Sequence, residues 1–278
     1  MGPGFLQLPR ERRLAYQHTP GQPPGVLFCG GYTSDMTCTK ALALEAFCRE
    51  QGRACTRFDY SGHGASSGDF ADGTIGAWAE DALAVVDRVT EGPVLVVGSS
   101  MGGWIMLLVA LARPERVRRL VGIAAAPDFT EDLLLAQATP EQRRALADQG
   151  YWLQDSAYGG DPYPVTRRFL EEARAHLVLR TPIPITCPVH LLHGQRDPDV
   201  PWQTALRLAE RLESEDVTVE LVKAGDHRLS TPPDLARITA AIERLAAPPS
   251  KPERRRLGCR GMSTLSARQS SAGSRAPA

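Results

Sequence analysis

The residues whose types and spacing point most directly to chemistry lie between Val94 and Trp104, in the stretch VLVVGSSMGGW. A mostly β-branched apolar run is followed at once by Gly98, Ser100 and Gly102 in the pattern G-x-S-x-G, and then by a second apolar run. This pattern is typical of a sharp strand-to-helix turn that exposes a nucleophilic serine, because the glycines on either side let strand and helix pass closely. Ser100 is therefore predicted to be a nucleophile.

The neighbouring serine does not fit the same turn. Ser99 would have Val97 and Met101 at the two glycine offsets, where side chains leave the turn no room. An ordinary glycine-rich turn is the simplest alternative, since G-x-S-x-G also occurs by chance. A phosphate-binding turn is not indicated, because the stretch contains neither G-x-x-x-x-G-K-[ST] nor G-x-G-x-x-G. Partners elsewhere in the chain must decide between these interpretations.

A serine hydroxyl needs a histidine to accept its proton and a carboxylate to hold that histidine in the correct tautomer. Both follow Ser100 in the chain, in the order serine, acid, histidine that accompanies this turn. Asp197 lies in HGQRDPDVP, directly after one predicted strand, and His227 lies in KAGDH after the next strand. We predict that Asp197 orients His227. Asp199 is the alternative acid, and a loop histidine bonded to Asp226 is the alternative for His227.

The negative charge that develops during attack on a carbonyl needs hydrogen-bond donors. The backbone N–H of Met101, which follows the serine, is predicted to be one donor, and the backbone N–H of Tyr32 the other. Gly30 and Gly31 would allow the loop that carries Tyr32 to approach closely. His63 lies at the end of another predicted strand and is expected to line the mouth of the site.

The elements that must position these residues alternate between strand and helix. Apolar runs and turn residues predict strands at 13–17, 26–29, 54–58, 94–97, 120–126, 189–192 and 217–222, and helices at 37–51, 74–90, 104–111, 202–212 and 233–246. Such alternation indicates an α/β fold with a mostly parallel sheet and helices on both faces. Sites in these sheets form at the carboxyl ends of the strands, where every candidate above is found.

The interval 127–186 interrupts this alternation. It contains helix-like segments at 131–137, 140–150 and 165–179 and is too long for a single connection. We predict a helical cap inserted over the strand ends; helices that only pad the edge of the sheet are the alternative. Apolar cap residues are candidates for binding an acyl chain, although packing is the commoner use of such residues: Leu133, Leu134, Leu135 and Trp152.

Composition limits the class of protein. The 278 residues carry a formal net charge of zero, which gives no reason to expect nucleic acid or a membrane surface as a partner. No run approaches the roughly 18 apolar residues of a membrane helix, and the six cysteines lack metal-ligand spacing and are expected to be reduced. We expect one domain over residues 12–247, a short leader at 1–11 and a disordered basic tail at 248–278.

The motifs GSSMGGW, FDYSGHGASSG, CPVHLLHGQRDPDVPW and DHR together resemble the α/β-hydrolase superfamily. Within it, the stretch 12–245 is most similar to the subfamily of α/β-hydrolase-domain-containing protein 10 and its bacterial relatives. The vertebrate members are mitochondrial serine hydrolases that remove palmitoyl groups from cysteine and cleave acyl glucuronides. The resemblance implies an α/β-hydrolase fold, with Ser100, Asp197 and His227 as the catalytic residues. It implies an S-acylated protein or a small-molecule ester as substrate and no metal or organic cofactor. It also implies a mitochondrial location, with the cytoplasm as the alternative.

Two other functions remain open on sequence alone. A small-amide hydrolase such as a proline iminopeptidase would need an acidic subsite for a free amine, which Asp128, Glu131 and Asp132 could supply. A ligand receptor without catalysis can be built on the same fold. Arg167 and Arg168 are candidate partners for the carboxylate of a glucuronide, although a solvated basic helix face explains them equally well.

Overall fold

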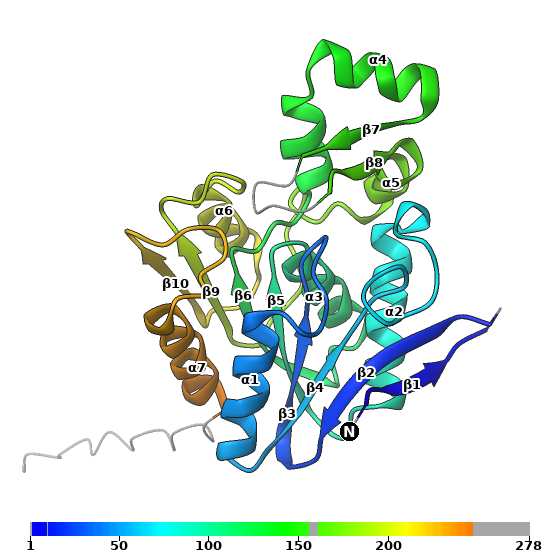
Figure 1. Cartoon of the computed structure of the whole chain (residues 1–278). Coiled ribbons are helices and arrows are strands. Elements are labelled where there is room, and N and C mark those ends of the chain that lie inside the picture. Colours follow the sequence, from blue (N-terminus) through cyan, green and yellow to red (C-terminus); the bar gives the residue numbers. More distant parts are fainter. Residues whose placement is uncertain (1, 10, 156–160, 247–278) are drawn as a thin grey trace, which may run out of the picture. The chain divides into compact units, whose positions relative to one another are not determined.

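The computed structural model describes residues 2–9, 11–155 and 161–246, so the expected tail at 248–278 lies outside the described residues. Within them, eight strands form one sheet in the order β1-β2-β4-β3-β5-β6-β9-β10. The strands are β1 (Gly4–Gln7), β2 (Arg13–Thr19), β3 (Gln22–Cys29), β4 (Arg53–Phe58), β5 (Val94–Ser99), β6 (Val117–Ile123), β9 (Val189–Gly194) and β10 (Val217–Val222). Figure 1 shows the sheet with its helices.

The sheet is mostly parallel, as the alternation of strands and helices predicted. The strands from β4 to β10 pair in parallel, while β2 pairs antiparallel with β4 and β1 antiparallel with β2. Residues 4–7 were expected to belong to a leader outside the domain, and this expectation was wrong. They form β1 because Leu6 alternates with more exposed residues and is itself buried, which gives this short strand a face to cover.

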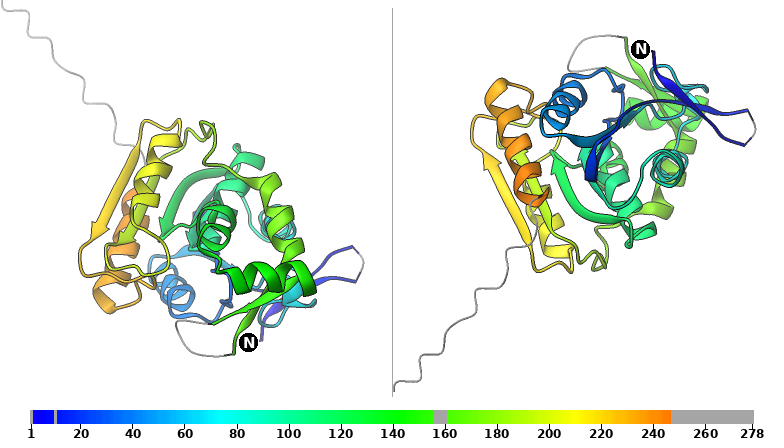
Figure 2. Two further views of the ribbon diagram at one scale, coloured as in Figure 1. Left: turned by 90° about the horizontal axis from the view of Figure 1, so that it is seen from above. Right: turned by 90° about the horizontal axis from the view of Figure 1, so that it is seen from below.

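Helices cover both faces of the sheet. They are α1 (Thr39–Glu50), α2 (Ile75–Arg88), α3 (Met101–Ala112), α6 (Gln203–Arg211) and α7 (Pro232–Ala246). Successive side chains of β3 point to opposite faces of the sheet. On one face, Leu27 and Cys29 pack in a buried cluster with α2, α3 and α6. On the other face, Val26 and Phe28 pack in a cluster with α1 and α7. The views from above and below show these helices on the two sides of the sheet (Figure 2).

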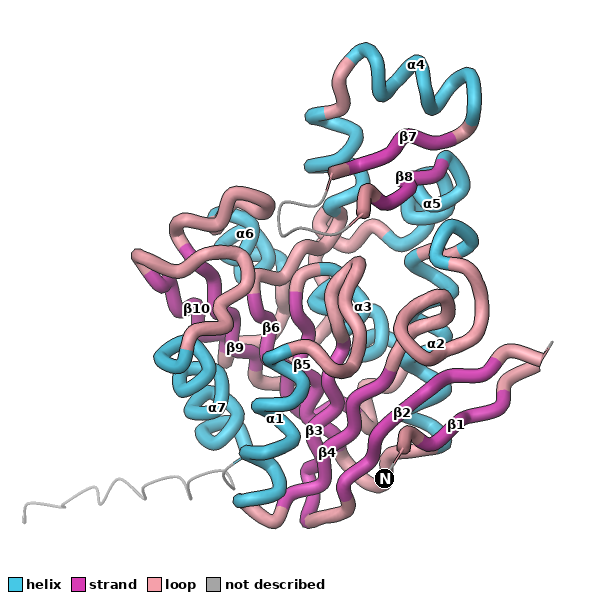
Figure 3. The backbone as a smooth tube through the Cα atoms, viewed as in Figure 1, coloured by secondary structure: helices cyan, strands magenta, loops and turns pink. Residues whose placement is uncertain are grey.

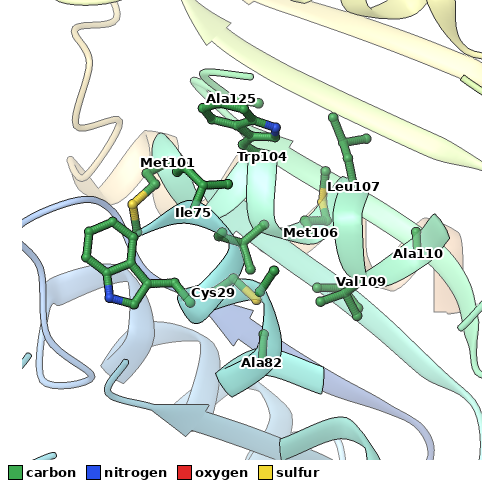
Figure 4. Packing of buried hydrophobic residues seen from close by; sticks show 14 of the residues in the cluster. Cys29, Ile75, Ala82, Met101, Trp104, Met106, Leu107, Val109, Ala110 and Ala125 are labelled. Carbon is green, nitrogen blue, oxygen red and sulfur yellow. The ribbon is translucent and has the colours of Figure 1, made fainter. Parts of the chain in front are cut away.

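The layer beneath the predicted nucleophile is tightly packed. Met101, Met106 and Val109 of α3 lie in one buried cluster with Ile75 and Ala82 of α2 (Figure 4). Nine of the twelve residues of α3 are buried, so the helix is apolar on nearly every side. A helix of this kind is held rigidly, which suits it to carry a residue whose position must be accurate.

The insertion at 127–186 is not entirely helical. It contains a π-helical turn (Thr130–Leu135), α4 (Pro140–Gln149), β7 (Tyr151–Gln154), β8 (Tyr163–Thr166), α5 (Arg167–Ala173) and a short 3-10 turn (Arg174–His176). Between the second and third predicted helical segments, β7 and β8 form an antiparallel pair that the sequence analysis did not predict (Figure 3). Along β7, the buried Trp152 lies between the exposed Tyr151 and Leu153, which is the period of a strand.

The bounds of α5 also differ from the prediction. The Thr166 hydroxyl accepts a hydrogen bond from the backbone N–H of Phe169, so the helix begins after Thr166. Trp104 of α3 donates its indole N–H to the carbonyl of His176 at 2.9 Å, which ties the end of the insertion to the sheet layer. No helix in the described residues combines the length and apolar character that crossing a bilayer requires.

Candidate active site

Ser100 lies in a strained turn between β5 and α3. Its backbone angles are φ 55° and ψ −121°, a conformation that side-chain-bearing residues rarely adopt. Two hydrogen bonds hold it there: the N–H of Ser100 donates to the carbonyl of Ile123 at 2.9 Å, and the N–H of Ala126 donates to the carbonyl of Ser100 at 3.0 Å. The predicted strand, turn and helix are therefore confirmed.

The glycines around Ser100 are required by close contacts. A Cβ atom on Gly102 would lie 2.1 Å from the carbonyl oxygen of Cys29, at the end of β3. A Cβ atom on Gly98 would lie 2.3 Å from the carbonyl oxygen of Gly102. The start of α3 therefore passes directly against two neighbouring strands, which explains the pattern G-x-S-x-G in physical terms.

Replacement of Gly102 by alanine is expected to destabilise the protein by about 1–3 kcal/mol, because the new methyl group must push the β3 backbone away. Urea unfolding measures this change. Gly30→Ala is the matched control, since its added Cβ would approach no other group closer than 3.7 Å. Equal stability of the Gly102 and Gly30 variants would contradict the tight contact.

Ser100, His227 and Asp197 form a hydrogen-bonded chain. His227 Nε2 lies 3.0 Å from Ser100 Oγ, and His227 Nδ1 lies 2.7 Å from Asp197 Oδ2. The three residues come from the ends of β5, β9 and β10, far apart in the sequence. The network assigns the proton on the neutral ring to Nδ1, which donates to the carboxylate, so that Nε2 can accept the proton of the serine hydroxyl.

Asp197 is held as a carboxylate. Its side chain is fully buried, and Oδ1 accepts the backbone N–H groups of Asp199 and Val200 at 2.9 and 2.8 Å. Burial by itself raises the pKa of Asp197, but hydrogen bonds from His193 and His227 outweigh it and hold the pKa well below its ordinary value. The bond from His227 Nδ1 favours Asp197 over Asp199 as the acid.

His193 is a contributor that the sequence analysis did not identify. Its Nε2 lies 3.2 Å from Asp197 Oδ2 and 3.0 Å from the carbonyl oxygen of Val200, and the residue is fully buried. It therefore fixes the loop that carries the carboxylate. His193 begins the motif H-G-x-x-D, and its position four residues before the acid was a signal for this role.

The two predicted backbone donors lie next to Ser100. Met101 is the first residue of α3, and the first N–H groups of an α-helix have no partner within the helix. The loop after β3 is close as well, since a Cβ atom on Gly31 would lie 3.6 Å from Ser100 Cβ. Among the described residues, no backbone hydrogen bond uses the N–H of Tyr32.

His63 does not line the mouth of the site, so that expectation was wrong. It is buried and is absent from the described residues around the cavity. Its Nε2 lies 2.6 Å from the backbone carbonyl oxygen of Tyr32. The His63 side chain therefore packs against the loop after β3 instead of facing the cavity.

A cavity of about 730 Å³ joins Ser100 and His227 to the inserted segment. Both the insertion and the sheet side supply apolar and polar lining residues. The insertion contributes Phe129, Leu133, Leu134 and Tyr163 together with Gln137, Thr139, Gln142, Gln154 and Asp155, and the polar residues on the sheet side include Ser34, Lys40, Arg228 and Ser230. Leu135 and Trp152, also candidates for contacting an acyl chain, are absent from the described lining.

The predicted acidic subsite for an amine is not formed. The Asp128 carboxylate is buried and accepts two backbone N–H groups, at 2.8 and 2.9 Å, from the segment that leaves the insertion. Glu131 pairs with Arg174 at 2.6 Å, and Asp132 pairs with Arg207 at 2.7 Å. None of the three acids is among the described residues that line the cavity. Asp128 and Glu131 bond within the insertion instead, and Asp132 joins it to α6.

The two arginines proposed for a glucuronide carboxylate are also engaged elsewhere. Arg167 donates to the backbone carbonyls of Leu146 and Ala147, and Arg168 lies 3.8 Å from Asp72. Neither is among the described lining residues of the cavity. That candidate role was therefore wrong; among the described lining residues, Lys40 and Arg228 carry basic side chains.

One group of described residues has side chains of metal-ligand type within reach of one another. Ligand atoms of Asp197, Asp199 and His227 lie within 4.8 Å of each other. Asp197 and His227 already bond directly, and Asp197 also accepts two backbone N–H groups. Asp197 and His227 are therefore hydrogen-bonded to each other, as in a proton-transfer chain.

Comparison with known proteins identifies the family of this chain. The model of the alpha/beta hydrolase family matches residues 26–238. The human palmitoyl-protein thioesterase ABHD10, mitochondrial, is 43% identical over 242 residues, covering 87% of this chain and 79% of the relative. The structure of mouse alpha/beta hydrolase domain-containing protein 10 covers 88% of this chain and 98% of its own, with 42% identity and a TM-score of 0.81. A putative hydrolase from Agrobacterium vitis S4 covers 89% and 97%, with 43% identity and a TM-score of 0.83. The chain therefore belongs to the α/β-hydrolase family.

Proposed function

We propose that this protein is a serine hydrolase that cleaves esters or thioesters through an acyl-enzyme. The observation that carries the proposal is the chain of hydrogen bonds from Ser100 Oγ to His227 Nε2 at 3.0 Å and from His227 Nδ1 to Asp197 Oδ2 at 2.7 Å. A buried carboxylate, an imidazole and a hydroxyl in this order are the groups that convert an alcohol into a nucleophile.

In the proposed reaction, Ser100 Oγ attacks the carbonyl carbon while His227 Nε2 takes the hydroxyl proton. Asp197 stabilises the imidazolium that forms, and the N–H groups of Met101 and Tyr32 bind the oxyanion. Collapse of the tetrahedral intermediate expels the alcohol or thiol, which receives the proton from His227. Water then attacks the acyl-enzyme with His227 again as base, which releases the carboxylic acid and restores Ser100.

For the substrate we propose an S-palmitoylated protein or a related acyl thioester. Two findings support this class: the relatives at 42–44% identity are named palmitoyl-protein thioesterases, and the apolar residues Phe129, Leu133 and Leu134 line the same cavity as Ser100. Acyl glucuronides are a second candidate, by resemblance to the subfamily. The names of the same relatives support a mitochondrial location, with the cytoplasm as the alternative.

A fluorophosphonate probe is expected to label the protein at Ser100. The hydroxyl displaces fluoride from phosphorus only when a base removes its proton, so labelling reports the activated nucleophile. Mass spectrometry of the digested protein identifies the modified residue. Absence of labelling in the folded protein would contradict the serine mechanism and would favour a ligand receptor without catalysis.

Turnover of three substrates separates the remaining alternatives. A palmitoyl thioester, a short p-nitrophenyl ester and an aminoacyl amide are compared at equal concentration. We expect hydrolysis of the thioester and the ester, and little of the amide, since Asp128, Glu131 and Asp132 are already bonded to other groups of the protein. A preference for the amide would contradict the proposed substrate class.

A further inference from the structure

His63 lies directly behind the loop that carries one of the two proposed oxyanion donors. It follows β4 in the FDYSGHG loop and is 5% exposed. Its Nε2 is 2.6 Å from the carbonyl oxygen of Tyr32, and its Nδ1 is 3.3 Å from the carbonyl oxygen of Ser61. Both ring nitrogens therefore face acceptors, and the Tyr32 carbonyl is the nearer of the two.

The ring of His63 carries one proton at neutral pH. Burial lowers the pKa of His63 below its ordinary value, although the hydrogen bonds to the carbonyls of Tyr32 and Ser61 act in the opposite direction. A neutral imidazole has one N–H, and the shorter distance assigns it to Nε2. His63 therefore donates a hydrogen bond to the backbone carbonyl of Tyr32.

Neighbouring aromatic rings hold both His63 and Tyr32. The His63 ring lies 5.3 Å from that of Trp78 and 5.1 Å from that of Phe70, measured between centroids. The Tyr32 ring has aromatic neighbours at centroid distances of 5.0–5.8 Å: Phe70 and Trp78 from the segment 70–78, and Phe129, Tyr163 and Phe169 from the insertion. Phe70 and Trp78 therefore pack against both rings, while the hydrogen bond from His63 acts on the Tyr32 carbonyl.

The two peptides on either side of Tyr32 are held by different hydrogen bonds. The Tyr32 N–H belongs to the same peptide as the Gly31 carbonyl, which accepts the N–H of Ser34 at 3.2 Å. Because Gly30 and Gly31 have wide conformational freedom, the direction of this N–H also depends on how the following peptide is held. The hydrogen bond from His63 holds that following peptide, one beyond the donor.

We propose that His63 is a positioning residue for hydrolysis: by binding the carbonyl of Tyr32, it aims the Tyr32 N–H at the oxyanion that forms on the carbonyl attacked by Ser100. This inference rests on the proposed function. The oxyanion exists only during the reaction, so the contribution of His63 appears in the transition state and not in substrate binding.

The matched pair His63→Gln and His63→Asn tests this role. Both introduce the same amide group, but glutamine places its nitrogen about as far from the backbone as Nε2, whereas asparagine places it at the distance of Nδ1. We expect His63→Asn to lower kcat about 10²-fold with KM unchanged, because a small displacement of one donor costs that much. His63→Gln should recover most of the loss. The affinity for a boronic acid that forms a tetrahedral adduct should fall and recover in parallel with kcat.

Thermal unfolding of each variant and a distant buried histidine serve as controls. His190 is also buried, its Nε2 lies 3.2 Å from Glu220 Oε2, and it is not among the described residues that line the cavity. We therefore expect His190→Gln to change the stability of the protein without changing kcat. Equal kcat in the asparagine and glutamine variants, whether normal or reduced, would overturn the role of His63. A wild-type protein that the fluorophosphonate does not label would instead contradict the proposed function itself.

Discussion

Ser100→Ala is expected to lower kcat for a p-nitrophenyl ester by about 10⁶-fold, as loss of the nucleophile does in a serine protease. The variant keeps the cavity and the backbone donors but has no oxygen to form the acyl-enzyme. The alanine must adopt the same strained backbone as Ser100, so circular dichroism and thermal unfolding should accompany the rate measurement.

The adjacent serine provides a discriminating control. Ser99→Ala is expected to retain fluorophosphonate labelling, because the hydrogen bond from the serine oxygen to His227 Nε2 belongs to Ser100. Labelling that survives in Ser100→Ala and disappears in Ser99→Ala would reverse the assignment of the nucleophile.

Asp197→Asn is expected to lower kcat by about 10⁴-fold, the loss seen when the orienting acid of a serine protease is replaced in this way. An asparagine has nearly the same shape but can present an N–H to His227 Nδ1, which would leave Nε2 protonated and unable to act as the base. Because the pKa of Asp197 lies well below its ordinary value, the wild-type carboxylate is ionised at neutral pH. The wild-type rate measured at pH 7 is therefore that of the enzyme with an ionised Asp197 carboxylate.

Asp199→Asn distinguishes the two candidate acids. Its backbone N–H donates to Asp197 Oδ1, and the substitution leaves that N–H in place. We expect this variant to keep the greater part of the wild-type rate. A loss at Asp199 as large as that at Asp197 would show that the second acid also serves the histidine, and a loss at Asp199 alone would identify it as the orienting acid.

The elements nearest the site were the most predictable. β5 and β10 were predicted within two residues of their observed ends, because buried strands of a parallel sheet are short apolar runs that end in turn residues. The inserted segment was less predictable. Tyr151–Gln154 and Tyr163–Thr166 are only four residues each, too short for a period of two to be recognised in the sequence, and pairing with each other makes them strands.

The roles of some polar side chains could be predicted from the sequence, and the roles of others could not. Ser100, Asp197 and His227 were singled out because each lies in a distinctive motif after a strand, and parallel strands bring their carboxyl ends to one edge. Asp128 and His63 also lie in polar, glycine-rich or acidic stretches, but their partners are the backbone of Val178 and Leu179 and the carbonyl of Tyr32. A backbone group has no signature in the sequence, so these bonds could not be predicted.

The sequence by itself determined the class of fold, the strand, turn and helix around Ser100, and the three groups proposed to carry the reaction. These depend on local patterns: apolar period, glycines at a tight turn and the order of motifs along the chain. Tertiary structure alone decided which acids remain available to a substrate and what restrains the loop of Tyr32. Such contacts join residues 31 to 50 positions apart, and their formation depends on how the whole chain packs.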